Sequence, residues 1–422
     1  MSPSDPSRRR FLAAAPVALA GLALPRWARA AQGTVVVVGG GFAGITFCRY
    51  LRRWSPGVRV VLVEPASQFV SCPMSNRVIY GTLSMHDITR DYVPVDGAGV
   101  ERIQDSVLAV DADKRQVRLA KGGTLAYDRL VLAPGVEFEY AALPGAKEAQ
   151  DRVLHAWKAG PQTIELRKRL HTMADGGVVA IYIPKAPYRC PPGPYERATL
   201  IGDFLANFKP RSKLIVFDAN ADVQSKRDLF RNYWESRLKG VLEYLPNAEV
   251  RNVDVAGQQV DMGVHGRHKV DVLNLIPPQK APAFALKACA EKADARWCAV
   301  DFLTYESRNV PRIHVLGDAI LAAKGMPKSG HMANQQAKVA AGAVARLLAG
   351  EPPDQEPLIA NTCYSFVSKR EAIHVAGVYR YDATGRTMVA VENAGGVSPA
   401  PSADEGFLAM AWYFNLMNDL FA

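Results

Sequence analysis

Hydrophobic residues in this chain form short continuous runs that alternate with helix-like stretches. The first run, "TVVVV" at 34–38, is followed by glycines and then by apolar residues at helical spacing; a second run, "RVVLV", occupies 59–63. Uninterrupted apolar runs of this length are typical of strands buried on both faces of a parallel sheet. The pattern therefore predicts an α/β fold in which strands and helices alternate.

The turn after the first predicted strand has the spacing G-x-G-x-x-G, formed by Gly39, Gly41 and Gly44. Glu64 ends the second strand, 20 residues after the last of these glycines. In such a turn the first glycine permits a tight bend, the second lets backbone approach a pyrophosphate, and the acid binds a ribose hydroxyl. Because strand, glycines, helix and acid occur in this order, the sequence predicts a dinucleotide site.

Two later segments make FAD the predicted dinucleotide. "YDRLVLAPG" (127–135) and "IHVLGDA" (313–319) resemble the two returning strands of the flavoprotein disulfide reductase superfamily. The resemblance implies that Asp318 contacts the flavin ribityl chain. It also implies that the helix after "MPKSG" directs its positive N-terminal end at the flavin. Together with the glycine loop and Glu64, we expect the following residues to bind FAD: Gly135, Asp318, Lys328, Ser329 and Gly330.

A second α/β pattern lies between these halves, with apolar runs at 176–184, 212–220 and 270–278. Where a pyridine-nucleotide enzyme has a second glycine loop, this chain has "IPKAPYRCPPGP" at 183–194. Prolines remove N–H donors, and side chains occupy the turn where a pyrophosphate needs bare backbone. The sequence therefore argues against NAD(P)H as the reductant.

These patterns predict two Rossmann-like dinucleotide-binding domains, arranged as in glutathione reductase, and a C-terminal interface domain. "GEPPDQEP" at 350–357 is the clearest linker. The predicted segments are a twin-arginine signal peptide at 1–30, an FAD-binding domain at 31–150 and 300–350, a second dinucleotide-binding-like domain without an NAD glycine loop at 151–299, and a flavin and partner interface domain at 351–422.

The amino end reads as an export signal. Arg8 to Arg10 precede an apolar run of 14 residues, Phe11 to Leu24, and a small-residue cleavage site follows near Ala30. The run is shorter than the roughly 20 residues that span a bilayer as a helix, so a retained membrane anchor is the less favoured interpretation. The twin-arginine route carries folded proteins, which suits a protein that acquires its cofactor before export. We therefore expect a periplasmic protein with its signal peptide removed.

Composition and charge exclude few functions. The net charge is +10 and the hydrophobic content 49%, as in an ordinary globular protein with a mildly basic balance. Beyond the amino end, no run rich in Lys and Arg with interleaved aromatic residues occurs, so we expect no nucleic-acid partner. The spacings of metal ligands and of c-type haem attachment (C-x-x-C-H) are absent, so we expect no metal site and no haem on this chain.

Six further motifs are distinctive, and three of them contain a cysteine. They are "SCPMSN" from Ser71, "HAWKAG" from His155, "YRCPPGPYER" from Tyr188, "NLIPPQKA" from Asn274, "MPKSG" from Met326 and "NTCYS" from Asn361. As a set they resemble the motifs of one family, the flavoprotein subunit of flavocytochrome c sulfide dehydrogenase. The resemblance covers essentially the whole chain after the export signal.

The resemblance implies a chemistry and a partner. FAD would be attached through a thioether to Cys72, and Cys190 and Cys363 would form a redox-active disulfide beside the flavin. Hydrosulfide can attack such a disulfide to give a persulfide and a thiolate, and Glu196 would be the acid/base group. Sulfide would be oxidised to sulfur or polysulfide, with electrons passing through FAD to a separate cytochrome c subunit that carries the haem.

Several alternatives remain open from sequence. The Cys190–Cys363 bridge could be structural rather than catalytic, and Cys289 and Cys298 are close enough in sequence to form a local bridge. Cys48 is expected to be a core residue. His155 and His331 are expected to be hydrogen-bonded structural residues rather than catalysts.

Two other functions also fit the pattern. A sulfide:quinone oxidoreductase has a similar fold and a cysteine pair but would need membrane contact, which we do not expect. An accessory flavoprotein that reactivates a thiosulfate-oxidising multienzyme system belongs to a different class. Whether the protein reduces quinone or cytochrome c separates the first alternative from the sulfide dehydrogenase interpretation. The neighbouring genes would separate the second alternative from it.

Overall fold

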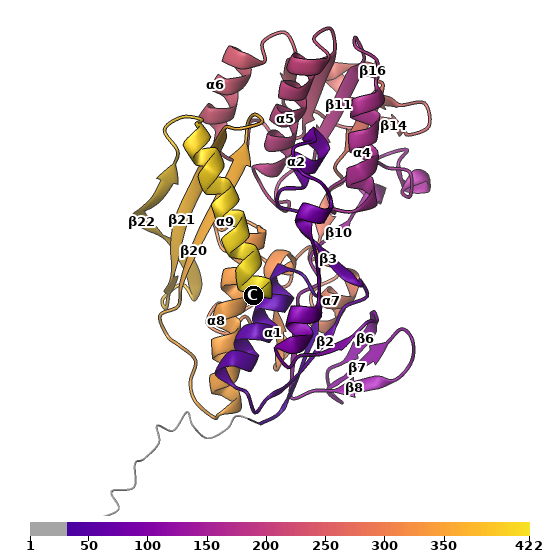
Figure 1. Ribbon diagram of the computed structural model, residues 1–422. Coiled ribbons are helices and arrows are strands. Elements are labelled where there is room, and N and C mark those ends of the chain that lie inside the picture. Colours follow the sequence, from indigo (N-terminus) through magenta and orange to yellow (C-terminus); the bar gives the residue numbers. More distant parts are fainter. Residues whose placement is uncertain (1–31) are drawn as a thin grey trace, which may run out of the picture.

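The computed structural model of the protein describes residues 32–422 (Figure 1). The predicted signal peptide, residues 1–30, therefore lies outside the described residues. In the first half a parallel sheet has the strand order β19-β9-β1-β2-β5. Its strands are β1 (Thr34–Val38), β2 (Arg59–Val63), β5 (Glu101–Ile103), β9 (Arg129–Leu132) and β19 (Ile313–Val315). The outer strand β19 is contributed by a segment far along the chain, as the resemblance implied.

Helices α1 (Phe42–Trp54) and α8 (Gly330–Leu348) lie side by side next to this sheet (Figure 1). The apolar strands form one core with the buried faces of these helices, which is why the strands show no alternation of polar residues. Smaller elements surround this half: β3 (Gln68–Val70), α2 (Ser75–Tyr80), β4 (Thr89–Asp91), α3 (Val93–Gly97), β6 (Val107–Asp111), β7 (Gln116–Leu119), β8 (Thr124–Ala126) and α7 (Ala283–Ala288).

The second half contains a parallel sheet of order β13-β12-β11-β17, with helices packed against it. Its strands are β11 (Val178–Ile183), β12 (Lys213–Asp218), β13 (Leu242–Leu245) and β17 (Val272–Leu275), and its helices are α4 (Pro161–Thr172), α5 (Gly193–Phe208) and α6 (Arg227–Arg237). Two small antiparallel sheets complete it: β14 (Asn252–Asp254), β15 (Gln259–Asp261) and β16 (Arg267–Lys269), and β10 (Glu137–Phe138) with β18 (Gln279–Lys280).

The C-terminal segment is an antiparallel three-stranded sheet followed by a long helix. The elements are β20 (Leu358–Phe366), β21 (Ala372–Asp382), β22 (Thr387–Val397) and α9 (Ala403–Phe421). β20 contacts both α8 of the first half and α5 of the second half. α9 packs on this sheet and returns to α1, so the segment bridges the two halves (Figure 1).

This mixed α/β architecture, with parallel Rossmann-like sheets, confirms the predicted fold class. The predicted domain boundaries stay predictions. Within residues 32–422, the structure contains no helix that is both long and apolar enough to cross a membrane.

Candidate active site

The glycine loop has the geometry that a bound pyrophosphate needs. Gly39 has a φ of 102°, and a Cβ there would lie 2.3 Å from the carbonyl oxygen of Ala133. A Cβ on Gly44 would lie 1.8 Å from the carbonyl oxygen of Gly39, so α1 can approach the strand only without a side chain. A Cβ on Gly41, by contrast, meets no atom within 4 Å. The loop thus leaves open space at the helix N-terminus, where a phosphate binds favourably.

Glu64 lies beside this loop, directly after β2. Its Oε2 accepts a hydrogen bond of 2.6 Å from the Gly40 amide, and its Oε1 accepts one of 2.8 Å from the Ala66 amide. These bonds hold the carboxylate at the loop, where a ribose would lie. Gly135, which follows β9, has a φ of 70° and open space around its missing Cβ. Both positions fit the FAD-binding role predicted for them.

Asp318 and Lys328 form a second part of the predicted flavin site. Asp318 follows β19, and its Oδ1 is buried without a hydrogen-bond partner among the described residues. Burial raises the pKa of this carboxyl. The Lys328 ammonium donates to the Asp318 carbonyl oxygen (3.0 Å) and lies 3.7 Å above the Trp297 ring. A buried acceptor without a donor is costly, and a ribityl hydroxyl is a donor, so the residues present fit FAD.

The N-terminus of α8 connects this part of the site to the C-terminal sheet. Ser329 caps the helix, because its Oγ accepts from the Met332 amide at 3.0 Å. The same hydroxyl donates to Asn361 Oδ1 on β20 (2.8 Å), and Asn361 Nδ2 donates to the sulfur of Cys363 (3.4 Å). Gly330 begins the helix, packed against the Phe42 ring. A continuous set of hydrogen bonds therefore runs from the predicted flavin site to one cysteine.

Cys190 lies in the proline-rich loop between β11 and α5. It has a left-handed backbone with a φ of 58°, and its amide donates to the Lys328 carbonyl oxygen at 2.7 Å. Its carbonyl accepts from the Gly193 amide at 2.9 Å, where α5 begins. The loop that replaces a glycine-rich turn thus fixes Cys190 against the "MPKSG" segment.

Cys190 and Cys363 lie close enough for the charge of one to act on the other, although 173 positions separate them. Burial raises the pKa of the Cys190 thiol above its usual range, and the negative charge of a Cys363 thiolate raises it further. In the structure both residues are thiols. The structure therefore brings the pair together, and the disulfide itself stays a prediction.

Glu196 lies in the first turn of α5, close to Cys190. Its Oε1 accepts from the Phe366 amide of β20 and its Oε2 accepts from Asn76 Nδ2, each at 2.9 Å. Burial raises the pKa of this carboxyl, so it keeps its proton to a higher pH than an exposed glutamate does. A half-buried carboxyl that acts on Cys190 suits the acid/base role predicted for it.

Cys72 lies between β3 and α2, and its half-buried sulfur is 4.0 Å from the Trp157 carbonyl oxygen. The Arg189 guanidinium also donates to that carbonyl. Negative charge on Cys72, Asp318 and Cys190 would raise the pKa of this guanidinium, so all three groups lie near it. Arg189 therefore lies among the residues predicted to surround the flavin, a role that its sequence context did not indicate.

Arg197 holds several of the sequence motifs together. Only 2% of this residue is exposed, and its guanidinium donates to Asn76 Oδ1 (3.0 Å) and Asn274 Oδ1 (3.1 Å). It also donates to the carbonyl oxygens of His155 (2.8 Å) and Ala156 (2.7 Å). One buried side chain thus joins the "SCPMSN", "HAWKAG" and "NLIPPQKA" segments around the site.

Lys226 is a site residue that sequence reasoning missed. It precedes α6 with a left-handed φ of 55°, and its ammonium reaches the cysteine pair from the second half of the molecule. The nearest acceptor atoms, the Cys363 carbonyl oxygen and Ser365 Oγ, are 3.0 Å and 2.7 Å away. The surrounding sequence "QSKRD" resembles any solvated polar stretch, so no local signal could have identified this lysine.

The remaining cysteines and the histidines have structural surroundings. Cys289 and Cys298 are buried neighbours, and the hydrogen bond between them raises the pKa of the Cys298 thiol. Both are thiols in the structure, so a bridge between them stays a possibility. Cys48 is fully buried in the core, as expected. His155 accepts from the Trp157 amide at 2.9 Å, and burial lowers its pKa to about 3, while His331 accepts from the Thr362 amide at 3.0 Å.

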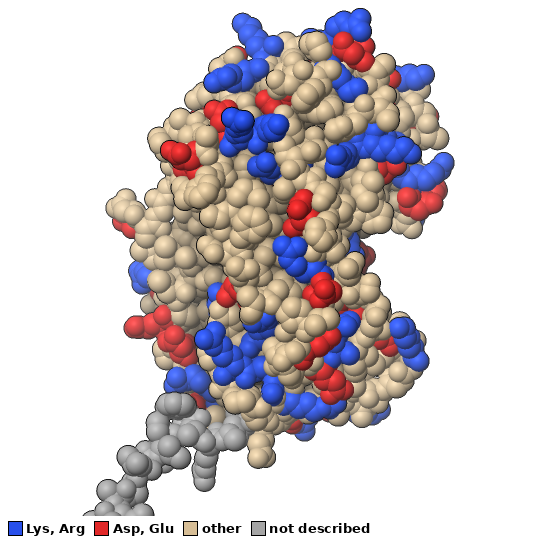
Figure 2. All heavy atoms as spheres, viewed as in Figure 1, with Lys and Arg blue, Asp and Glu red and all other residues tan. Residues whose placement is uncertain are grey.

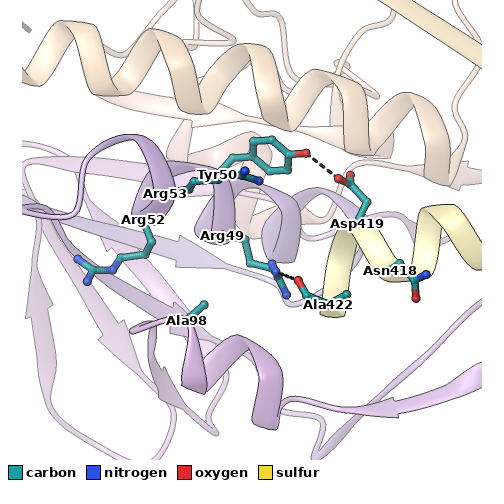
Figure 3. A pocket seen from close by; sticks show the side chains of 8 residues that line it. All are labelled: Arg49, Tyr50, Arg52, Arg53, Ala98, Asn418, Asp419 and Ala422. Atoms are coloured by element: carbon teal, nitrogen blue, oxygen red, sulfur yellow. Dashed lines mark hydrogen bonds between the residues drawn. The ribbon is translucent and has the colours of Figure 1, made fainter.

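A cavity of about 450 Å³ lies elsewhere, between α1 and the end of α9 (Figure 3). Some of its polar groups pair with one another: Tyr50 donates to Asp419 at 2.6 Å, and Arg49 donates to the Ala422 carbonyl. It contains no cysteine. Among residues 32–422, no group of three or more His, Cys, Asp or Glu side chains is placed to hold a metal ion.

Three family models match the chain. "Sulfide dehydrogenase [flavocytochrome c] flavoprotein chain, central" matches residues 163–277, and "Flavocytochrome c sulphide dehydrogenase, flavin-binding" matches residues 355–421. "Pyridine nucleotide-disulphide oxidoreductase" matches residues 33–171. These matches cover both halves of the molecule and the C-terminal segment that contains Cys363.

Individual proteins show the same relationship. The flavoprotein chain of sulfide dehydrogenase from Chlorobaculum thiosulfatiphilum is 57% identical over 44 residues, which are 10% of this chain and 92% of that sequence. A mitochondrial sulfide:quinone oxidoreductase from Mus musculus is 24% identical over 67% of this chain, and the match spans 65% of that protein's length. The solved sulfide:quinone oxidoreductase of Aquifex aeolicus has the same fold, with a TM-score of 0.75 at 17% identity over 92% of each chain.

The matched segments include the proline-rich loop, the α5 carboxyl and the C-terminal cysteine, and the C-terminal model is a flavin-binding one. The parallel-sheet fold agrees with these matches, and so does the glycine loop, which leaves open space at the N-terminus of α1. The chain belongs to the family of flavocytochrome c sulfide dehydrogenase flavoprotein chains, which are sulfide-oxidising flavoprotein oxidoreductases that bind FAD.

Proposed function

We propose that the protein is a periplasmic sulfide dehydrogenase subunit that oxidises sulfide at a Cys190–Cys363 disulfide. The observation that carries the proposal is the meeting of these two cysteines with the half-buried carboxyl of Glu196. Hydrosulfide would form a new S–S bond to one cysteine, breaking the disulfide and leaving its electron pair on the other cysteine as a thiolate. Glu196 would take up the proton released from the sulfide sulfur.

FAD would accept the two electrons of the reduced pair, which restores the disulfide once the added sulfur has left as sulfur or polysulfide. The residues that would hold the cofactor are those of the glycine loop, Glu64, Gly135, Asp318 and the α8 N-terminus. Cys72 would attach it covalently, and its half-buried thiol lies near Arg189, on which Cys190 and Asp318 also act. Flavin that stays with the denatured chain, and is lost in Cys72→Ser, would support this attachment.

The electron acceptor in this proposal is a separate cytochrome c subunit. The outer face of α9 supports a partner there: Phe407, Leu408 and Phe414 are 75%, 48% and 51% exposed. Figure 2 shows few charged side chains along the middle of this helix. Exposed apolar patches of this kind mark interaction sites. Export to the periplasm rests on the amino-terminal pattern, and lysines in place of Arg8 to Arg10 should block it.

An anaerobic titration tests the proposal. Purified protein receives sulfide or, separately, NADH while the absorbance of oxidised flavin is followed. Sulfide should bleach the flavin, NADH should not, and Cys190→Ser should abolish bleaching while far-UV circular dichroism stays native. If sulfide leaves the flavin oxidised, the proposal is wrong.

One observation favours a second candidate, because the fold match to a sulfide:quinone oxidoreductase covers 92% of the chain. The two candidates differ in their acceptor. Sulfide-reduced protein that reduces cytochrome c in detergent-free buffer, but not a soluble quinone, supports the first. The reverse result supports the second.

A further inference from the structure

Lys226 places a positive charge inside the protein beside the cysteine pair. Only 7% of the residue is exposed, and its ammonium donates to the Cys363 carbonyl oxygen (3.0 Å), Ser365 Oγ (2.7 Å) and the Ile373 carbonyl oxygen (3.5 Å). All three acceptors are uncharged. Within the described chain, no carboxylate lies within 4.0 Å of this ammonium.

A buried charge without a counter-charge is unfavourable. Burial accordingly lowers the pKa of Lys226 to about 8. The negative groups that face it act in the opposite direction, and the strongest effect comes from Cys363, followed by Glu196, Cys190 and Glu405. With a pKa of about 8 the ammonium is still charged at neutral pH, and the negative charge that acts on it most strongly is that of a Cys363 thiolate.

A role in joining β20 to β21 does not explain this lysine. The two strands already pair in antiparallel register, with Cys363 opposite Val375 and Ser365 opposite Ile373. An apolar side chain of similar length would fill the same space without burying a charge. The feature that needs explanation is therefore the charge itself.

Two donors contact Cys363 directly. Asn361 Nδ2 donates to the Cys363 sulfur at 3.4 Å, and Lys226 binds the carbonyl oxygen of the same residue. Burial, then the charge of a Cys363 thiolate and that of Glu196, raise the pKa of Cys190, while Lys226 and Arg189 lower it. Because Lys226 interacts more strongly with Cys363 than with Cys190, the leaving thiolate is better accommodated on Cys363.

We propose that Lys226 is a positioning residue that stabilises the Cys363 thiolate released when hydrosulfide attacks Cys190; this inference rests on the proposed function. In the step, a bond forms between the hydrosulfide sulfur and the Cys190 sulfur. The bond between Cys190 and Cys363 breaks, and its electron pair stays on Cys363. The sulfide sulfur is oxidised by the amount that the Cys363 sulfur is reduced, so no further oxidant is needed.

The test measures thiolate formation without sulfide turnover. In a Cys190→Ser background, Cys363 cannot enter the disulfide, and its alkylation by iodoacetamide is followed against pH by peptide mapping. Lys226→Gln, which keeps donor groups without the charge, should move the alkylation midpoint up by about one to three pH units, the usual effect of an adjacent opposite charge. The alkylation rate at pH 7 should fall about tenfold or more, and Lys226→Arg should restore much of it.

A matched control is Lys209→Met. The Lys209 ammonium also binds backbone carbonyls, those of His171 (3.1 Å) and Met173, but away from the cysteines. This control should leave the midpoint unchanged. If Lys226→Gln fails to fold, Lys226→Met in the same background provides the comparison.

An unchanged midpoint in a folded Lys226 variant overturns the inference. Failure of the proposed function gives a different result: sulfide would not bleach the flavin of the otherwise unaltered protein, whatever the alkylation midpoint. With both results favourable, Lys226→Gln on the Cys190-containing chain should slow sulfide-driven bleaching about tenfold at pH 7, by the same loss of thiolate. An undiminished rate there would also contradict the inference.

Discussion

Replacing Arg197 with methionine should destabilise the protein strongly, because its guanidinium satisfies buried acceptors from three segments. After Arg197→Met, the His155 carbonyl keeps a hydrogen bond from Asn274 Nδ2 at 2.9 Å. The Ala156 carbonyl, Asn76 Oδ1 and Asn274 Oδ1 each lose their donor. A buried unsatisfied acceptor costs about 1–3 kcal/mol, so three of them cost about 3–9 kcal/mol.

Two further effects partly cancel. The guanidinium lies 4.8 Å from the Trp157 ring, so its loss removes a cation–π contact worth about 1–2 kcal/mol in a buried place. Methionine, however, is uncharged and avoids the cost of burying a charge. That cost is seen in Arg197 itself, because burial lowers its pKa to about 10. We expect a net loss of about 3 kcal/mol or more, a large part of the roughly 5–15 kcal/mol that stabilises a typical protein.

Urea unfolding of the flavin-loaded protein, followed by circular dichroism and flavin fluorescence, measures this change. The matched control is Arg211→Met, because the Arg211 side chain is 76% exposed and pairs only with Asp175 at the surface. That control should change the free energy of unfolding by less than about 1 kcal/mol. If Arg197→Met is as stable as the control, the reasoning about unsatisfied acceptors is refuted.

Two further predictions concern the same site. In Glu196→Gln the side-chain NH₂ group would face one of the two N–H donors that now bind the carboxyl oxygens, so one donor would lose its acceptor. This should lower the free energy of unfolding by about 1–3 kcal/mol. Because burial raises the folded pKa of Glu196, wild-type stability should fall as pH rises above the unfolded value of about 4.3, so the variant's deficit should shrink with pH. Urea titrations across pH check this, and a constant deficit would contradict it. Ser329→Ala removes both the cap of α8 and the donor to the buried Asn361 Oδ1, so it should cost about 2–4 kcal/mol by thermal unfolding, while Ser329→Gly should cost slightly less. Equal stability of Ser329→Ala and wild type would show that the cap contributes nothing.

The sequence by itself determined the fold class and the dinucleotide loop. The apolar runs at 34–38 and 59–63 became adjacent parallel strands, paired from Thr34 with Arg59 to Val38 with Val63. Such features are local, since each depends on residue spacing along a few turns or strands and on backbone preferences of glycine. Where a family resemblance supplied the residue roles, as for Cys72 and Glu196, the structure supplied the surroundings that make those roles chemically reasonable.

Only the tertiary structure decided which side chains control the charge around the sulfurs. Lys226 and Arg197 look like ordinary polar residues of helical segments, yet one lies at the cysteine pair and the other at the centre of three motifs. The position of Lys226 depends on how β20 and β21 of the C-terminal sheet reach the segment before α6, and that of Arg197 on how α5 packs against α2; both arrangements are long-range. A charged side chain carries no periodic signal of its burial, because burial is a property of the packed elements around it rather than of its neighbours in sequence.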